Sequence, residues 1–328
     1  MTTYAQQPVW REIQKFLPEA YQIKPGQEPG EEWWTWERDR IHLDTYRNPR
    51  ATVKVILFHG LGTNGRQIMA ILGAPLARRG YESIAIDMPG YGLTEVGDGH
   101  LVSYEDWVQA GSDVIDAELA RDDRPIVLYG FSAGGMLTYD VAAKSRKVKG
   151  IVGMTFFDNR EQFVRDTASR NLFTSRVGGP AMHLLAKTPL HSMRIRMRDA
   201  IKMNALVNNK GALRVFLKDP TSAGNAMTTA FLASYLSHVP VVEPEDFDVC
   251  PILLTQPAAD HWTPLNLSQP FLKRIRKVPV KTVMLENAGH YPLEEPGLTT
   301  MVESIDAFYR SVAAPGHPRD ASNFFCTN

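Results

Sequence analysis

Cysteine is scarce in this sequence, since only Cys250 and Cys326 among its 328 residues carry a thiol. Neither residue belongs to a group of cysteines and histidines with the spacing of a metal site. Two thiols so far apart also form no disulfide framework. We therefore expect a chain that folds around a hydrophobic core, without disulfide bonds and without a metal site.

An excess of one charge and long apolar runs are also absent. The 36 basic residues balance the 36 acidic ones, so no overall field attracts nucleic acid or a membrane surface. No stretch approaches the roughly 18 apolar residues of a membrane span, and residues 1–5 lack the basic and apolar regions of a signal peptide. We expect a soluble, cytoplasmic protein with no nucleic-acid partner and no stable membrane insertion, and the oligomeric state stays open.

Strand and helix patterns alternate along most of the chain. Two strand-like runs at 31–37 and 41–46 predict an antiparallel hairpin at a sheet edge. Further strands are expected at 53–58, 83–87, 126–129, 150–156, 251–254 and 280–285, and helices at 67–79, 103–120, 136–143 and 298–312. Strands that alternate with helices form a parallel sheet with helices on both faces. The sequence thus predicts the α/β class, with a mostly parallel central sheet.

The alternation stops in the middle of the chain. Residues 158–249 are helical in composition with glycine and proline breaks, which predicts an inserted helical cap. The catalytic core is then expected to consist of residues 1–157, with the hairpin extension in 1–50, and of residues 250–314. Residues 315–328 are expected to form a loose tail.

The most informative motif is Gly-Phe-Ser-Ala-Gly at residues 130–134. It follows an apolar strand and precedes a helix-forming stretch, which is the pattern of a nucleophile elbow. The turn is so tight that side chains at the two glycine positions would collide. This context favours Ser132 as a nucleophile whose hydroxyl lies above the sheet.

A serine hydroxyl needs a base within hydrogen-bond reach and a carboxylate that orients the base. His290 follows the last expected strand directly, and Asp260 follows the strand before it. Both therefore lie at the carboxyl edge of the sheet, where ligands bind in such folds. We interpret Ser132, Asp260 and His290 as catalytic. Asp158 is the alternative acid, although we favour it as the N-cap of the first cap helix.

A second glycine-rich loop follows the strand at 53–58. Its sequence at residues 59–62 is His-Gly-Leu-Gly. The backbone N–H groups of Leu61 and Ala133 can point to one place there and form an oxyanion hole, which commonly lowers an acyl-transfer barrier by about 3 kcal/mol per donor. His59 is expected to brace this loop and to transfer no proton.

Taken together, these motifs make the chain similar to an α/β-hydrolase over residues 34–312, and most similar to lysophospholipase and monoacylglycerol-lipase-like esterases. The motifs concerned are residues 59–62, 87–92 and 130–134, Asp260 and His290. A serine nucleophile disfavours the haloalkane dehalogenase and epoxide hydrolase branches. The chain departs from many relatives before the acid, where Gln-Pro-Ala-Ala at 256–259 replaces their Gly-x-x-Asp turn.

The resemblance implies a serine hydrolase without a cofactor. It would cleave a carboxylic ester, or a related acyl bond, of a small or lipid-like substrate through an acyl-enzyme. The same three residues also suit a thioesterase, lactonase, amidase or acyltransferase. Two hypotheses of another class are a lyase that forms no acyl-enzyme and a ligand receptor without catalysis.

The expected cap is basic, with twelve Lys or Arg and five Asp or Glu over residues 158–219. Leu190, Met193, Met197 and Ile201 recur at helical spacing with arginines between them. One hypothesis is a lid that meets anionic lipid or substrate. We favour the other, a cap helix that packs its apolar stripe on the core while the arginines reach water. The candidate pocket residues are Phe131, Phe157, Trp262, Met193 and Met197.

Overall fold

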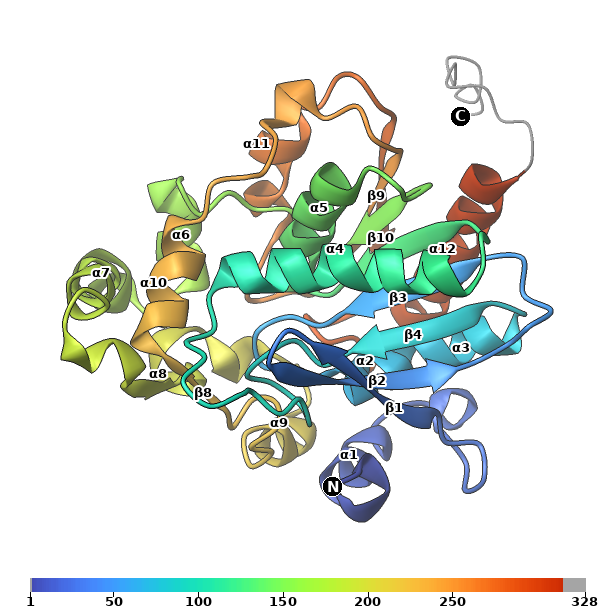
Figure 1. The fold of residues 1–328 in the computed structure, drawn as a ribbon, viewed down its shortest axis with the longest axis horizontal. Helices are drawn as coiled ribbons and strands as arrows, with labels where there is room; N and C mark the ends of the chain where they lie inside the picture. Colours follow the sequence, from blue (N-terminus) through green and yellow to red (C-terminus); the bar gives the residue numbers. More distant parts are fainter. Residues whose placement is uncertain (1, 315–328) are drawn as a thin grey trace.

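The computed structural model describes residues 2–314, and the expected tail at 315–328 lies outside the described residues together with Cys326. An eight-stranded sheet forms its centre, in the order β1-β2-β4-β3-β5-β6-β9-β10 (Figure 1). The strands are β1 (Gly30–Trp36), β2 (Asp39–Tyr46), β3 (Lys54–Phe58), β4 (Glu82–Ile86), β5 (Ile126–Gly130), β6 (Ile151–Gly153), β9 (Ile252–Pro257) and β10 (Val280–Leu285).

The sheet is parallel from β4 to β10, and only β1 and β2 run antiparallel to their neighbours. Strands β3, β4 and β5 are buried along their whole length, which is why they read as continuous apolar runs. The predicted fold class and the edge hairpin are therefore confirmed.

Helices cover both faces of this sheet. Helices α4 (Tyr104–Arg121) and α5 (Ala133–Ser145) pack together on one face, whereas α3 (Ala74–Arg78) and α12 (Gly297–Ala313) pack together on the other (Figure 1). Ser103 caps α4 through a capping box with Asp106. The remaining helices of the core are α1 (Val9–Gln14), α2 (Gly65–Ile68) and α11 (Gln269–Leu272), with a π turn at Met69–Gly73 and 3-10 turns at Tyr4–Gln6, Glu19–Tyr21 and Leu265–Leu267.

Residues 158–249, here called the cap segment, form a group of short elements at one end of the sheet (Figure 1). They are α6 (Gln162–Ala168), α7 (Gly179–Leu185), β7 (Arg194–Arg196), α8 (Met197–Ala200), α9 (Lys210–Phe216), β8 (Ala226–Thr228) and α10 (Thr229–Ser237), with a π turn at Thr174–Gly178 and 3-10 turns at Pro189–Ser192, Met203–Ala205 and Pro244–Asp246. Its status as a separate domain stays a prediction. Within residues 2–314 no helix has both the length and the apolar character that crossing a bilayer requires.

The prediction of an amphipathic helix around residues 190–201 is wrong. Leu190 lies in a 3-10 turn, and β7 pairs with β8 across thirty residues of chain. Met193 is 39% exposed, whereas Met197 is buried. The pairing of β7 with β8 therefore overrides the helical spacing and separates the stripe into differently buried parts.

The end of the cap segment is attached to the core by a buried ion pair. His238, just after α10, places Nε2 2.9 Å from Oδ2 of Asp140 on α5. Asp140 also accepts a hydrogen bond from the backbone N–H of Val241. Burial alone would lower the pKa of His238, but its contacts with Asp140 and Glu105 raise that pKa to about 9.

This ion pair predicts a loss of stability in alkali. A histidine with a raised pKa in the folded state stabilises the fold below its unfolded pKa of about 6.5, and the contribution disappears as the pH rises through the folded value. We expect the free energy of unfolding to fall by about 2 kcal/mol more in the wild type than in a His238→Gln variant between pH 6.5 and 10. Urea unfolding of both proteins across this range measures the difference, and parallel curves would contradict it.

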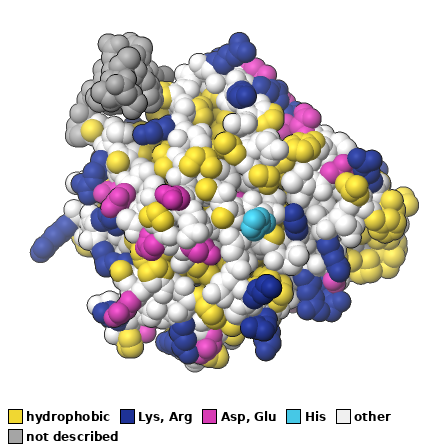
Figure 2. Space-filling view, turned by 180° about the vertical axis from the view of Figure 1, so that it is seen from behind, with side chains coloured by type: hydrophobic (Ala, Val, Ile, Leu, Met, Phe, Trp, Pro, Cys, Tyr) yellow, Lys and Arg dark blue, Asp and Glu magenta, His cyan; other side chains and the backbone are white. Residues whose placement is uncertain are grey.

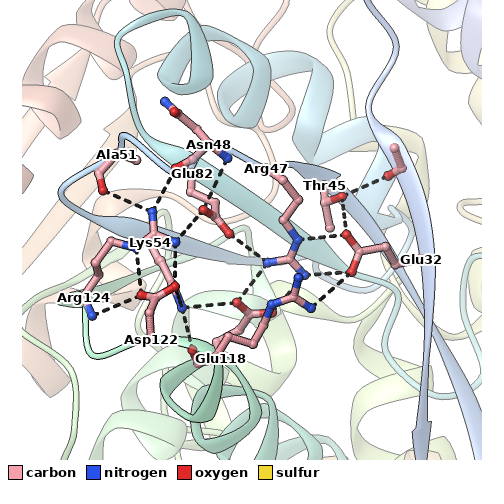
Figure 3. Close-up of polar contacts among 12 residues, drawn as sticks. Glu32, Thr45, Arg47, Asn48, Ala51, Lys54, Glu82, Glu118, Asp122 and Arg124 are labelled. Carbon is pink, nitrogen blue, oxygen red and sulfur yellow. Dashed lines mark hydrogen bonds and ion pairs between the residues drawn. The ribbon is translucent and has the colours of Figure 1, made fainter.

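A second charged cluster joins the sheet to α4 (Figure 3). The side chain of Lys54 is fully buried and lies 3.0 Å from Asp122 and 3.5 Å from Glu118. Arg47 donates two hydrogen bonds of 2.9 Å to the Glu118 carboxylate. Glu118 thus compensates two cations at once, although its own side chain is almost entirely buried.

Removal of this carboxylate should destabilise the fold. Arg47 also pairs with Glu32 and Glu82, and Lys54 pairs with Asp122, so the cluster keeps part of its charge compensation. Because two charge-assisted hydrogen bonds are lost, we expect Glu118→Ala to lower the free energy of unfolding by about 2 kcal/mol. The matched control is Asp116→Ala on the same helix, because Asp116 pairs with Lys147 where both side chains are half exposed. A surface pair of this kind contributes less than about 1 kcal/mol. Equal losses in urea unfolding of the two variants would refute the role given to Glu118.

Candidate active site

Ser132 lies in the sharp turn between β5 and α5. Its backbone has φ 53° and ψ −123°, a conformation that residues with a side chain rarely adopt. The flanking glycines allow the turn, because a Cβ on Gly130 would lie 1.9 Å from the carbonyl oxygen of Gly134. A Cβ on Gly134 would lie 2.7 Å from the carbonyl oxygen of His59. The structure therefore shows why the motif has glycine at both positions, as the sequence suggested.

Three side chains from distant parts of the chain meet at this turn. Oγ of Ser132 lies 2.8 Å from Nε2 of His290, and Nδ1 of His290 lies 2.8 Å from Oδ2 of Asp260. Asp260 follows β9 and His290 follows β10, so the carboxyl edge of the sheet brings them together. Burial alone would raise the pKa of Asp260, but His290 and two backbone N–H groups hold it well below its usual range. The acid therefore stays ionised beside the imidazole.

Thr263 supports this arrangement, a role that we did not predict from the sequence. Its Oγ1 donates to Oδ2 of Asp260 at 2.8 Å and lies 3.1 Å from Nδ1 of His290. The backbone N–H groups of Trp262 and Thr263 donate to Oδ1 of the same aspartate at 2.7 and 2.8 Å. The available signal was an aspartate followed three residues later by a threonine, which is typical of a side chain that closes its own turn.

The alternative acid, Asp158, is bonded to a different partner. Its carboxylate accepts hydrogen bonds from the guanidinium and the backbone N–H of Arg160, whereas His290 is bonded to Asp260. The expected N-cap role is also wrong, because α6 begins at Gln162 and its N-cap is Glu161. Arg160 instead joins Asp158 to Glu243 at the two ends of the cap segment.

The loop after β3 lies against the elbow. Nδ1 of His59 lies 2.9 Å from the carbonyl oxygen of Gly60, and Nε2 accepts a hydrogen bond of 2.9 Å from the N–H of Met88. Burial lowers the pKa of His59, so a neutral ring braces the loop, in agreement with the sequence interpretation. The N–H groups of Leu61 and Ala133 donate no hydrogen bond to any other described residue, and both residues line the cavity at Ser132.

Asp87 connects the residues after this loop to the N-terminal part of the chain. Its Oδ1 accepts from the N–H of Gly65 at 2.7 Å, and its Oδ2 accepts from the hydroxyl of Tyr4 at 3.0 Å. Nδ1 of His42 lies 2.9 Å from the same Oδ2. The N-terminal segment is therefore tied to the start of α2, just after the glycine-rich loop, and no motif in the sequence indicated this contact.

The group Glu31, His42 and Asp44 is the one set of side chains among residues 2–314 whose spacing suits a metal ion. Cationic side chains already compensate the carboxylates of this group. Burial alone would lower the pKa of His42, but its contacts with Asp87 and Glu31 raise it to about 10, and Arg66 pairs with Asp44. A protonated imidazole is no metal ligand, so we interpret the group as an ion-pair network.

Ser132 opens onto a small cavity of about 40 Å³, which Phe157 and Trp262 line. A cavity of about 700 Å³ lies next to it, among the elements of the cap segment. The residues that line both are Leu61, Arg165, Ser169, Ile201, Tyr235 and Leu236.

Three of the five candidate pocket residues are placed elsewhere. Phe131 lies behind the site, with its ring centroid 5.3 Å from that of His290 and 5.6 Å from that of Tyr291. Met193 and Met197 line neither of the two cavities. From the same part of the chain, Ile195 and Ile201 line the cavities instead.

The parallel sheet, the elbow and the cap elements define an α/β-hydrolase. Residues 48–297 match the family Hydrolase_4, described as serine aminopeptidase, S33. Because this match covers well over half of the chain, the protein belongs to that family.

Similar proteins lie in the branch that the sequence resembled. Phospholipase YtpA of Bacillus subtilis (strain 168) is 30% identical over 125 residues, which are 36% of this chain and 42% of that protein. The chain therefore matches less than half the length of this curated relative. A soluble variant of the monoglyceride lipase from Saccharomyces cerevisiae, solved with a substrate analogue, has a TM-score of 0.70 at 15% identity over 90% of this chain and 99% of its own. The monoacylglycerol lipase of Paleococcus ferrophilus has a TM-score of 0.61 at 16% identity over 83% and 98%.

The hydrogen bonds of Thr263 predict that it positions the acid and the imidazole. We expect Thr263→Val to slow covalent labelling of Ser132 by a fluorophosphonate about tenfold, because a hydrogen bond to an ionised group is lost. Thr263→Ser keeps the hydroxyl and should restore most of the rate. If valine and serine slowed labelling equally, the hydroxyl would have no positioning role.

Proposed function

We propose that this protein is a serine hydrolase that cleaves carboxylic esters of lipid-like substrates through an acyl-enzyme. The observation that carries the proposal is the continuous hydrogen-bond chain from Asp260 through His290 to Ser132, at a serine that opens onto a cavity. This arrangement provides a nucleophile, a base and a group that orients the base.

In the proposed reaction, Oγ of Ser132 attacks the ester carbonyl while Nε2 of His290 accepts the hydroxyl proton. The carbonyl electrons move onto oxygen, where the N–H groups of Leu61 and Ala133 stabilise the negative charge. Collapse of this intermediate breaks the bond to the alcohol, which leaves with the proton held by His290. The ionised Asp260 stabilises the imidazolium in between.

Water then completes the reaction. It attacks the acyl-enzyme and gives a proton to His290, and the second tetrahedral intermediate collapses to release the carboxylic acid. Ser132 recovers its proton from the imidazolium. The side chains of the site thus return to their starting state without any other group.

The shape and chemistry of the cavity support a lipid-like substrate. Its volume of about 700 Å³ is in the range of sites that enclose an organic ligand. Its apolar lining includes Met182, Ile195, Leu232 and Leu236. Hydrophobic side chains also gather on the outer edge of the molecule that carries the cap segment (Figure 2), where Phe173 is 73% and Leu184 is 68% exposed.

The family description names an aminopeptidase, but the lining does not favour that substrate class. A peptide N-terminus is a cation and requires a carboxylate partner. Among residues 2–314, the one carboxylate that lines the two cavities is Asp199, which pairs with Arg196 at 2.8 Å and with Arg170 at 3.4 Å. The cavity therefore offers no uncompensated acid to a peptide amine.

Hydrolysis of a series of nitrophenyl esters tests the proposal. We expect kcat/KM to rise with acyl chain length, and Ser132→Ala to lower it by about four orders of magnitude or more. The matched control is Ser145→Ala at the other end of α5, which should stay within about twofold of the wild type. Full activity in Ser132→Ala would refute the proposal. If the wild type hydrolysed only thioesters, amides or lactones, the proposed substrate would carry that bond in place of the ester.

A further inference from the structure

Arg165 of α6 lies where the two cavities join. It lines the small cavity together with Ser132 and Trp262, and it also lines the large cavity within the cap segment. A substrate whose carbonyl reaches Ser132 while the rest of the molecule fills the large cavity therefore passes this side chain.

The guanidinium group of Arg165 has no carboxylate partner within residues 2–314. Nη1 donates to the backbone carbonyl oxygens of Asn159 and Arg160, and Nη2 donates to Oε1 of Gln162 at 2.6 Å. All three acceptors are neutral. The side chain is partly buried, so its charge has lost part of its hydration and gained no counter-ion.

Among residues 2–314, the other arginine and the one aspartate that line the cavities both have ion-pair partners. Arg176 lies 2.8 Å from Asp166, and Asp199 is compensated by Arg196 and Arg170. Within residues 2–314, Arg165 is therefore the one arginine lining these cavities that has no carboxylate partner, and it lines the small cavity together with Ser132.

We propose that Arg165 binds an anionic oxygen group of the substrate, so that the preferred esters carry a carboxylate or a phosphate near the scissile bond. A planar guanidinium pairs with such groups through charge-assisted hydrogen bonds. The interaction is strengthened by the partly desolvated surroundings. This inference rests on the proposed ester hydrolysis and adds the substrate class to it. The carbonyl contacts of Arg165 hold the group in place and leave its charge for the ligand.

Two matched substrate pairs test the inference and separate the two sources of charge. One pair is monooctanoylglycerol and octanoylglycerol 3-phosphate, and the other is 4-nitrophenyl butyrate and 4-nitrophenyl hydrogen succinate. We expect the wild type to prefer the anionic member of at least one pair in kcat/KM. Arg165→Gln should lower kcat/KM for that anionic member at least tenfold and change the neutral member less than threefold. The pair that responds identifies a phosphate or a carboxylate as the group bound.

Two further variants control the interpretation. Arg165→Lys keeps the charge and should retain most of the anionic preference. Arg170→Gln removes a positive charge from the same part of the chain, but Arg170 is exposed, pairs with Asp199 and lines neither cavity, so its substrate ratios should match those of the wild type. Melting temperatures of all variants show whether each one folds. An unchanged ratio of anionic to neutral kcat/KM in Arg165→Gln would overturn the inference.

A binding measurement separates this inference from the proposed function. In the Ser132→Ala protein, calorimetry with octanoylglycerol 3-phosphate and with monooctanoylglycerol should give tighter binding of the phosphate. Addition of Arg165→Gln should abolish that difference. If the binding preference is found in a protein that hydrolyses no ester, the proposed function fails and the anion site stands. If esters are hydrolysed and neither assay shows a role for Arg165, the anion site fails alone.

Discussion

The backbone of Ser132 is held in a strained conformation, and the rest of the site depends on it. A residue with φ 53° and ψ −123° costs about 1–3 kcal/mol. The strain persists because β5 is buried on both faces and the chain on either side of the turn packs without space for a Cβ at Gly130 or Gly134. The same turn directs Oγ toward His290 and leaves the N–H of Ala133 free at the start of α5.

Support for this turn comes from parts of the chain that are far apart in sequence. Thr263 bonds to the acid and lies 3.1 Å from the hydroxyl of Thr155, which follows β6. Asp87 in turn ties the start of α2, just after the glycine-rich loop, to His42 and Tyr4. Each support uses buried hydrogen bonds to an ionised carboxylate, which are stronger than bonds between neutral groups. The geometry of three side chains is thus determined by the whole sheet edge.

The sequence predicted those features that local pattern alone determines. The elbow at residues 130–134 needs two glycines within a five-residue turn, and the alternation of apolar strands and helices determines the order of the core. Because parallel strands end at one edge, the positions of Asp260 and His290 after their strands were sufficient to expect them near Ser132.

Features that depend on pairing across long distances were not predictable in this way. Residues 194–196 have helical spacing with their neighbours, but they form a strand because residues 226–228 lie beside them. The hydrogen bond between Tyr4 and Asp87 joins residues 83 positions apart, and no local sequence pattern predicts it. Arg165 is one of twelve basic residues over 158–219, and only the structure distinguishes it, by its place at the cavity and its neutral acceptors.

Rapid mixing with a nitrophenyl ester, followed by acid quench and peptide mass mapping, tests the central claim most directly. The account predicts a burst of nitrophenol close to one equivalent of enzyme whenever deacylation is the slower step. With an ester whose deacylation is the slower step, it also predicts an acyl group on the peptide that contains Ser132. A burst with no acylated peptide, or with the acyl group on another residue, would contradict it.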